Sequence, residues 1–214
     1  MTAHSSKFWN RFADRYSRKP VSDPAAYQRK LEKTREYFTR ESRVLELGCG
    51  TGSTSLAHAP YVSEIMATDY SNRMIEIAKH KASKEGIQNV HFEVANANHA
   101  HGFDSDGTYD VIMAHSLIHL LDRPHAIVPT VFTKLREGGV FIQNTPVLGE
   151  KKAFLKPIFK LAKLLRLLPK ISVLKIDDLT SVLSSAGFDI EYIVFYSSAD
   201  AIFIVARKPL KMTD

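Results

Sequence analysis

Three glycines spaced by two residues, at the end of an apolar run, are the residues best suited to chemistry in this chain. The run at residues 43–47 predicts a buried strand and Ser53 begins a predicted helix, so Gly48, Gly50 and Gly52 form the turn between them. Glycine allows a tight turn and lets a ligand approach the backbone with no Cβ in the way. The helix that follows presents unpaired N–H groups and the positive end of its dipole. The pattern therefore predicts a turn that binds a nucleotide or a nucleoside.

Two acidic residues near this turn indicate which ligand it binds. Asp69 comes 17 residues after Gly52, at the end of the second predicted strand, where its carboxylate can accept hydrogen bonds from both hydroxyls of a ribose. Glu46 precedes the turn, and a carboxylate there repels a pyrophosphate but suits a ligand that carries an ammonium group. Ser53 stands where the dinucleotide-binding pattern has its third glycine. S-adenosylmethionine has an adenosine, an ammonium and a sulfonium but no phosphate, so the residues predict this cofactor rather than NAD.

The segment at residues 46–52, Glu-Leu-Gly-Cys-Gly-Thr-Gly, resembles the first motif of class I methyltransferases, and the ubiquinone/menaquinone C-methyltransferase-like branch is the most similar in its pattern. Further segments resemble that family in the same order, at residues 10–16, 67–74, 109–120, 135–139 and 185–188. The resemblance covers about residues 40–207. It implies an S-adenosylmethionine-dependent methyltransferase with an α/β fold, a Rossmann-like three-layer sandwich. Its seven-stranded, mostly parallel sheet would end in an antiparallel C-terminal hairpin.

The resemblance also implies a cofactor site with residues from several segments. The predicted cofactor-binding residues are Tyr16, Glu46, Gly48, Cys49, Gly50, Gly52, Asp69, Tyr70, Met74, Asn96, Ala97 and His115. Within this set, the glycine turn lines the methionine part, Asp69 holds the ribose, and Tyr70 and Met74 flank the adenine. Asn96 stands at the adenine amino edge where the family usually has Asp, and its side-chain oxygen can still accept from that amino group. We interpret Cys49 as a small buried residue rather than as a nucleophile.

Two histidines near the fourth predicted strand are candidates for acid–base chemistry. His115 ends that strand and His119 follows it, and an unperturbed imidazole titrates near pH 6.5. Packing or hydrogen bonding is the simpler explanation of either histidine. Of the two, we predict His119 as the catalytic residue because it lies beyond the strand, nearer the acceptor. No metal site is predicted, because His91, His99 and His101 form no pair four residues apart and have no carboxylate cluster beside them.

Alternating apolar clusters and helical patterns predict βαβ units around a parallel sheet. We predict an N-terminal helical cap at residues 1–42, a methyltransferase domain at 43–207, and within it a basic amphipathic helical insertion at 149–176 that forms a lid. The predicted helices are 24–39 with Asp23 as cap, 53–59, 72–84 with Ser71 as cap, 122–137, and 178–186 with Asp177 as cap. The predicted strands are 43–47, 64–69, 90–94, 109–114, 140–144, 188–196 and 201–206, and residues 96–108 are a predicted loop.

Basic residues are concentrated in two segments of a chain whose formal net charge is +6. Residues 1–43 contain 11 Lys and Arg against 5 Asp and Glu, and residues 151–176 contain 8 Lys and Arg and no acid. Such asymmetry indicates an anionic partner, although two solvated helices explain it equally well. For the insertion, the alternatives are a lid whose lysines face water, or docking on an anionic membrane or a lipid-like substrate. Nucleic acid is not expected, because aromatic residues do not alternate with the basic ones and no recognition motif is present.

The predicted reaction is direct displacement at the sulfonium methyl, with a small molecule or a lipid-like compound as the acceptor. Such a reaction mainly requires alignment and exclusion of water, so no catalytic dyad is expected. The alternatives are a non-catalytic S-adenosylmethionine-binding or interaction protein, and an NAD-dependent oxidoreductase. A single cysteine, and the lack of a signal-peptide pattern or a membrane-spanning apolar stretch, predict a cytoplasmic protein, membrane-peripheral if the insertion docks. No oligomeric state is predicted.

Overall fold

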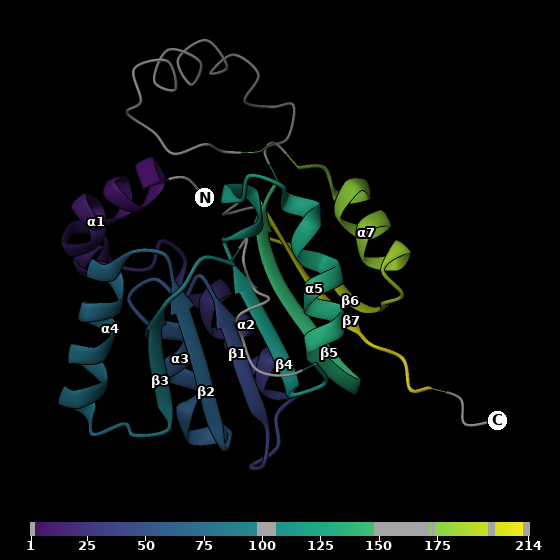
Figure 1. Ribbon diagram of the computed structural model, residues 1–214, viewed down its shortest axis with the longest axis horizontal. Coiled ribbons are helices and arrows are strands. Elements are labelled where there is room, and N and C mark those ends of the chain that lie inside the picture. The colour runs from purple at the N-terminus through teal and green to yellow at the C-terminus, as the bar shows by residue number, and fades with distance from the viewer. Residues whose placement is uncertain (1–2, 98–105, 148–171, 173, 197–199, 212–214) are drawn as a thin grey trace, which may run out of the picture.

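The computed structural model describes residues 3–97, 106–147, 172, 174–196 and 200–211. Among these residues, seven strands form one sheet in the order β3-β2-β1-β4-β5-β7-β6, with helices on both of its faces (Figure 1). The strands are β1 (Arg43–Leu47), β2 (Glu64–Asp69), β3 (Val90–Val94), β4 (Tyr109–His115), β5 (Leu135–Pro146), β6 (Asp189–Tyr196) and β7 (Ala201–Arg207). The helices are α1 (Ala3–Arg18), α2 (Pro24–Arg35), α3 (Ser53–His58), α4 (Asn72–Glu85), α5 (Ile127–Lys134) and α7 (Ile176–Ser185). Short 3-10 turns are η1 (Ala59–Tyr61), η3 (Ile118–Leu120) and η4 (Pro124–Ala126).

The strand pairing confirms the predicted α/β sandwich. β1 pairs in parallel with β2 on one side and with β4 on the other, and β4 pairs in parallel with β5. β7 lies antiparallel between β5 and β6, which forms the predicted C-terminal hairpin. Because the chain order reverses direction across the sheet at β1, a crevice is expected beyond the carboxyl ends of β1 and its two neighbours.

Two apolar clusters hold the helices against the two faces of the sheet. On one face, Leu45 and Phe141 pack with the buried residues of α5 and α7. On the other face, Val44 and Ile65 pack with those of α2, α3 and α4. Four consecutive β1 residues, 44–47, are buried, as expected for a central parallel strand covered on both sides. Because helices cover both faces of the sheet at this strand, the side chain of Glu46 is also buried.

Local capping chemistry places the starts of two helices as predicted. The Asp23 carboxylate accepts a hydrogen bond from the Ala26 backbone N–H at 2.8 Å and begins α2. The Ser71 hydroxyl accepts from the Met74 N–H at 3.2 Å and begins α4. Gly86, at a φ of +67°, ends α4 in the left-handed conformation that glycine adopts freely. These signals act within four residues, which is why the sequence alone identifies them.

The predicted boundaries of three helices and one strand are wrong. α2 ends at Arg35 rather than at residue 39, because the N–H groups of Tyr37 and Phe38 bond back three residues and close tight turns. α5 begins only after the turn η4 and ends at residue 134. β5 begins at residue 135 rather than at residue 140, because Leu135 pairs with Tyr109 of β4. α7 is capped at Lys175 rather than at residue 177.

Two predicted segments fall largely outside the described residues, namely most of the loop at 96–108 and most of the insertion at 149–176. The predicted amphipathic helix of that insertion is therefore untested, and so is the predicted boundary between cap and domain at residues 42 and 43. Among the helices that the structure describes, none is long and apolar enough to cross a membrane.

Candidate functional site

The glycine turn after β1 leaves its backbone open at one position and is tightly packed at another. A Cβ at Gly52, where φ is +76°, would lie 2.7 Å from the ring of Phe92, so only glycine fits there. A Cβ at Gly50, where φ is +55°, would have only the Tyr16 ring within 4 Å among the described residues, at 3.9 Å. The third glycine of the turn, Gly48, also has a positive φ of +68°. The turn therefore presents bare backbone at Gly50, beneath Tyr16.

Asp69 lies at this turn, at the end of β2. One of its carboxylate oxygens accepts a hydrogen bond from the Gly50 N–H at 3.0 Å, and the other accepts from the Ser71 N–H at 2.8 Å. Burial raises the pKa of Asp69 above its ordinary value, and these backbone donors oppose that rise. A carboxylate fixed beside the turn can also accept hydrogen bonds from a pair of hydroxyl groups, because each oxygen has two lone pairs.

Three backbone donors of the turn are already used within the protein. The Cys49 N–H donates to the Thr68 carbonyl at 2.9 Å, the Gly50 N–H donates to Asp69, and the Gly52 N–H donates to the Cys49 carbonyl at 3.0 Å. A phosphate-binding loop instead points such N–H groups at its anion. A pyrophosphate placed here would lose those three donors and would meet a carboxylate. The geometry thus favours a ligand without phosphate and agrees with the preference that Glu46 indicated in the sequence.

Glu46 is a fully buried acid on the same face of the sheet as Asp69, with β1 and β2 in parallel register. The Ser55 hydroxyl, in the first turn of α3, donates a hydrogen bond to its carboxylate. Burial raises the pKa of Glu46 to about 7, with the Asp69 charge as a smaller contribution in the same direction. Burial also raises the pKa of the Cys49 thiol well above its usual range, and a protonated thiol is a poor nucleophile. The site is thus acidic, and it suits a ligand with positive charge.

Tyr16 borders the turn from the N-terminal helix α1. The side chain is 51% exposed. Partial desolvation is the largest cause that raises the pKa of its phenol, and the negative charges of Asp69 and Glu46 raise it further. α1 is held beside the start of α4 because the Asn10 side-chain oxygen accepts from the Ser71 hydroxyl at 2.6 Å. Ser71 also caps α4, so one short segment positions α1, α4 and Asp69 together.

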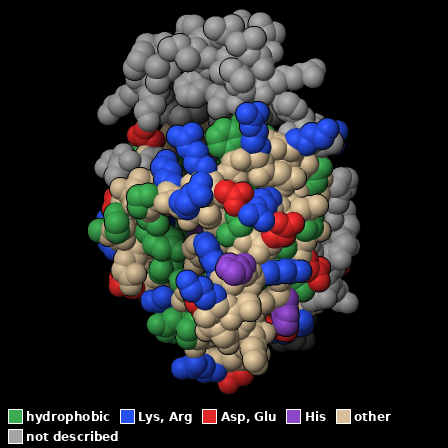
Figure 2. Space-filling model, turned by 90° about the vertical axis from the view of Figure 1, so that its left-hand side faces the viewer, with side chains coloured by type: hydrophobic (Ala, Val, Ile, Leu, Met, Phe, Trp, Pro, Cys, Tyr) green, Lys and Arg blue, Asp and Glu red, His purple; other side chains and the backbone are tan. Residues whose placement is uncertain are grey.

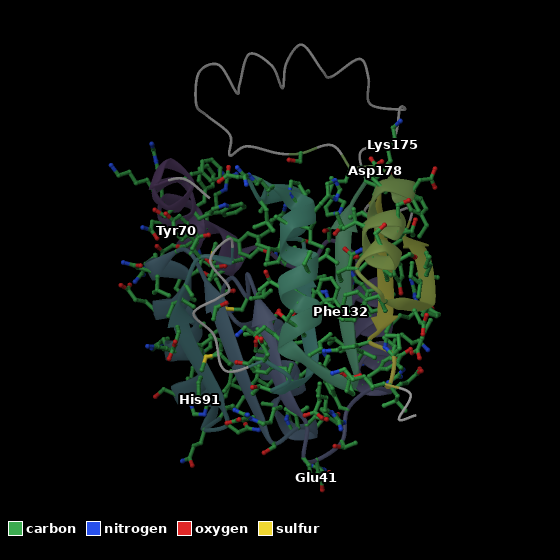
Figure 3. All side chains as sticks on the ribbon, turned by 45° about the vertical axis from the view of Figure 1, so that its right-hand side comes forward. Glu41, Tyr70, His91, Phe132, Lys175 and Asp178 are labelled. Carbon is green, nitrogen blue, oxygen red and sulfur yellow. The ribbon has the colours of Figure 1, made fainter. Side chains whose placement is uncertain are left out.

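The residues predicted to surround the adenine lie at the same end of the sheet. Tyr70 follows β2, and in Figure 3 it lies near the upper end of the sheet, whereas His91 lies toward the opposite end. Met74 is buried in the first turn of α4. Asn96 is half-buried and follows β3, whose end pairs with the end of β2. Ala97, next to it, is buried.

Both candidate histidines are neutral at physiological pH. Burial lowers the pKa of His115 to about 4, with the Lys30 charge as a smaller cause, and its ring stacks on Phe203 at 6.4 Å between centroids. Burial also lowers the pKa of His119, on η3, to about 4. The His119 Nδ1 atom is buried and has no hydrogen-bond partner among the described residues. His119 therefore has a ring nitrogen whose hydrogen-bond partner is not supplied by the described residues.

Asn144 is a further candidate residue, which the sequence reasoning missed. It pairs with His115 across β4 and β5, at the carboxyl end of the sheet. Its side-chain oxygen is buried and has no hydrogen-bond partner in the part of the chain that the structure describes. The sequence feature that could have identified Asn144 is its place as a polar residue at the end of the apolar run at 140–144. Within the described ranges, no group of three or more His, Cys, Asp or Glu side chains could hold a metal ion.

Comparison with known proteins agrees with this geometry. Residues 38–190 match the family described as Methyltransferase domain. The chain is 33% identical over 116 residues to the uncharacterized methyltransferase YcgJ of Bacillus subtilis, an alignment that covers 51% of this chain and 45% of that protein. It is 31% identical over 108 residues to the demethylmenaquinone methyltransferase of Leptospira interrogans, covering 49% of this chain and 43% of that protein.

The alignments with these two curated relatives therefore span less than half of each relative's length. The crystal structure of the Bacillus YcgJ protein is similar over 86% of this chain and 100% of that chain, with a TM-score of 0.70 and 18% identity. At this level of identity the likeness shows a shared fold.

Proposed function

Because the chain belongs to the methyltransferase domain family, with S-adenosylmethionine as its methyl donor, we propose that it methylates a small quinone-like acceptor. The acceptor class rests on the relative named as a demethylmenaquinone methyltransferase, of which the alignment spans 43%. The observation that most supports the donor site is the position of the Asp69 carboxylate. Two backbone N–H groups fix this carboxylate beside the bare backbone of Gly50.

On the donor side, we assign binding roles to the residues around the turn. Asp69 accepts hydrogen bonds from the ribose hydroxyls, and the carboxylate of Glu46 attracts the ammonium group. Tyr70 and Met74 contact the adenine, and Asn96 accepts from its amino group. The fit is supported by the use of the turn's N–H groups within the protein, which leaves carboxylates rather than N–H donors toward the ligand. Tyr16 covers the turn and excludes water.

On the acceptor side, we assign His119 the role of accepting a proton. S-adenosylmethionine supplies a methyl group already activated by its sulfonium. The protein then has to align the acceptor and keep water out. A neutral imidazole with an unpartnered Nδ1 can accept a hydrogen bond from a phenolic hydroxyl, such as the hydroxyl of a reduced quinone, and can take its proton once methyl transfer has made that hydroxyl acidic. His115 and Asn144 lie at the same edge of the sheet and contribute polar contacts. The insertion at 149–176 would cover this edge as a lid, or dock on an anionic membrane.

The direct test is methyl transfer from isotopically labelled S-adenosylmethionine to a short-chain demethylated naphthohydroquinone, followed by mass spectrometry. We expect product that carries one labelled methyl group. Asp69→Asn should raise the KM for the donor, and His119→Gln should lower kcat with little change in that KM. If compounds in a fractionated cell extract are methylated but the naphthohydroquinone is not, the proposed acceptor class is wrong and the donor assignment still holds.

A further inference from the structure

The N-terminal helix α1 carries a stripe of basic side chains on its outer face. Lys7, Arg11, Arg15 and Arg18 follow one another at intervals of four, four and three residues, which places them on one side of a helix. All four are exposed. Figure 2 shows Lys and Arg side chains over this side of the molecule, on its upper part as well as lower down. The stripe is therefore a positive surface.

The acidic residue of α1, Asp14, is paired mainly with Arg73 of α4, and the charge of Arg18 makes a smaller contribution to lowering the Asp14 pKa. Asp14 bonds through both carboxylate oxygens to the guanidinium of Arg73 on α4, at 2.7 and 3.1 Å. No ion pair joins any of the four basic residues to an acid among the residues that the structure describes. The charges of Lys7, Arg11 and Arg15 are therefore available to an external anion, and that of Arg18 is partly offset by Asp14.

An aromatic stripe borders the basic one on the same helix. Phe8 stacks on Phe12, with centroids 4.5 Å apart, and meets Trp9 edge-on at 5.3 Å. Trp9 also meets Tyr16 edge-on at 6.4 Å. Phe12 is 37% exposed and Tyr16 is 51% exposed. The rings thus pack largely on one another and leave apolar surface open to the outside.

The opposite face of α1 makes the attachment to the rest of the protein, and that attachment is mostly polar. Ala13 is fully buried against the body of the protein. Beside it, Asn10 accepts from the Ser71 hydroxyl and from the Arg73 N–H, and Asp14 pairs with Arg73. The apolar stripe of α1 is therefore not the face that joins α1 to the fold.

We propose that this surface of α1 docks the protein on an anionic lipid bilayer. The surface consists of two aromatic residues, Phe8 and Phe12, and four basic ones, Lys7, Arg11, Arg15 and Arg18. A helix with adjoining aromatic and basic stripes lies in the plane of the membrane interface, with its rings among the headgroups and its cations against anionic lipid. A single-stranded nucleic acid fits less well, since it needs free ring faces for its bases, and here the Phe8 and Phe12 faces cover each other.

The location of the stripe connects it with the site. Tyr16, at the end of the aromatic stripe, borders the bare backbone of Gly50. A bilayer against α1 would therefore lie beside the turn, where an apolar acceptor could enter directly from the lipid. This inference extends the proposed function, because it names the source of the acceptor. The vesicle experiment that tests it contains neither donor nor acceptor, so its outcome is independent of methyl transfer.

The test is co-sedimentation of the full chain with phosphatidylcholine vesicles that contain or lack phosphatidylglycerol, at low and at physiological salt. We expect binding only to the anionic vesicles and weaker binding at the higher salt. Arg11→Gln/Arg15→Gln should lower the partition coefficient by roughly 10- to 30-fold, since each removed cation weakens surface attraction. Phe12→Ser should lower it several-fold and should leave the salt dependence unchanged.

The matched control is Lys79→Gln/Lys84→Gln, which removes the same charge from exposed positions of α4. It should bind within about twofold of the wild type if the surface of α1 makes the contact. Equal loss in the control, equal binding to neutral vesicles, or no binding at low salt would each overturn the proposal. Binding to single-stranded RNA without binding to vesicles would assign the surface to nucleic acid and would overturn it as well.

Discussion

The affinity for S-adenosylmethionine should depend on pH through Glu46. Burial raises the pKa of this carboxyl to about 7 in the free protein, so the group is mostly neutral at pH 6 and mostly charged at pH 8. An ammonium beside Glu46 binds favourably only to the charged form. If binding scales with that fraction, the affinity falls by about tenfold from pH 8 to pH 6. We therefore expect a Kd about ten times larger at pH 6.

Isothermal titration calorimetry in two buffers of different ionisation enthalpy measures both the affinity and the protons exchanged. At pH 7 the wild type should release roughly half a proton per bound ligand. Glu46→Gln keeps an oxygen that can accept from Ser55 but cannot titrate. Its affinity should be flat between pH 6 and 8 and, at pH 8, lower than that of the wild type by about 1.5–3 kcal/mol. Glu93→Gln, at an exposed position of β3, is the control and should behave as the wild type.

Asp69 is present in both proteins, so its own titration cancels in the comparison of the wild type with Glu46→Gln. A wild-type Kd that stays constant between pH 6 and 8 would refute the reasoning. Full wild-type affinity of Glu46→Gln at pH 8 would refute it too, because the ammonium would then be bound by other groups.

Three further outcomes follow from the same contacts. The folded-state pKa of Glu46 lies above its ordinary value of 4.5, so this group favours folding at acidic pH and loses that contribution as the pH rises through about 7. Glu46→Gln should therefore be more stable than the wild type to urea at pH 8, by up to about 3 kcal/mol, and not at pH 4; equal stabilisation at both pH values would contradict this. Asp69→Ala should weaken binding of the methyl donor in calorimetry by about 1.5–3 kcal/mol, and an unchanged Kd would mean that the ribose is held elsewhere. Gly52→Ala should lower the free energy of unfolding by about 1–3 kcal/mol, because the new Cβ would meet the ring of Phe92. The control is Gly86→Ala, where φ is also positive but nothing lies within 4 Å of the new Cβ, and it should lower the free energy by about 1 kcal/mol. Thermal or urea unfolding measures both.

Features of the fold that depend on neighbouring residues were predictable from the sequence. The caps at Asp23 and Ser71 act over three residues, and the strand at 43–47 is marked by its own apolar run. The end of α5 was not predictable in this way. It depends on Leu135 pairing with Tyr109, which is 26 positions earlier in the chain, and no local pattern encodes that contact.

The same distinction holds for the candidate site. The proximity of Asp69 to the glycine turn followed from the parallel βα pattern. The internal use of the turn's N–H groups did not, because the bond from Gly50 to Asp69 depends on the exact approach of β2 to β1. Asn144 was missed because its partner, His115, lies on another strand. Its importance depends on strand order rather than on its sequence neighbours.

The carboxylate of Asp69 links the Gly50 turn to the start of α4 before any ligand is present. The carboxylate that we propose as the ribose ligand is consequently fixed before binding, so the protein would lose little conformational freedom when a nucleoside binds there. Hydrogen bonds from the ribose to Asp69 would not distinguish the methylated donor from the demethylated product, since both have the same ribose. Both also have the same ammonium group, so Glu46 does not separate them through that contact either. Only the sulfonium charge differs, and discrimination between donor and product must therefore come from the groups that face the sulfur.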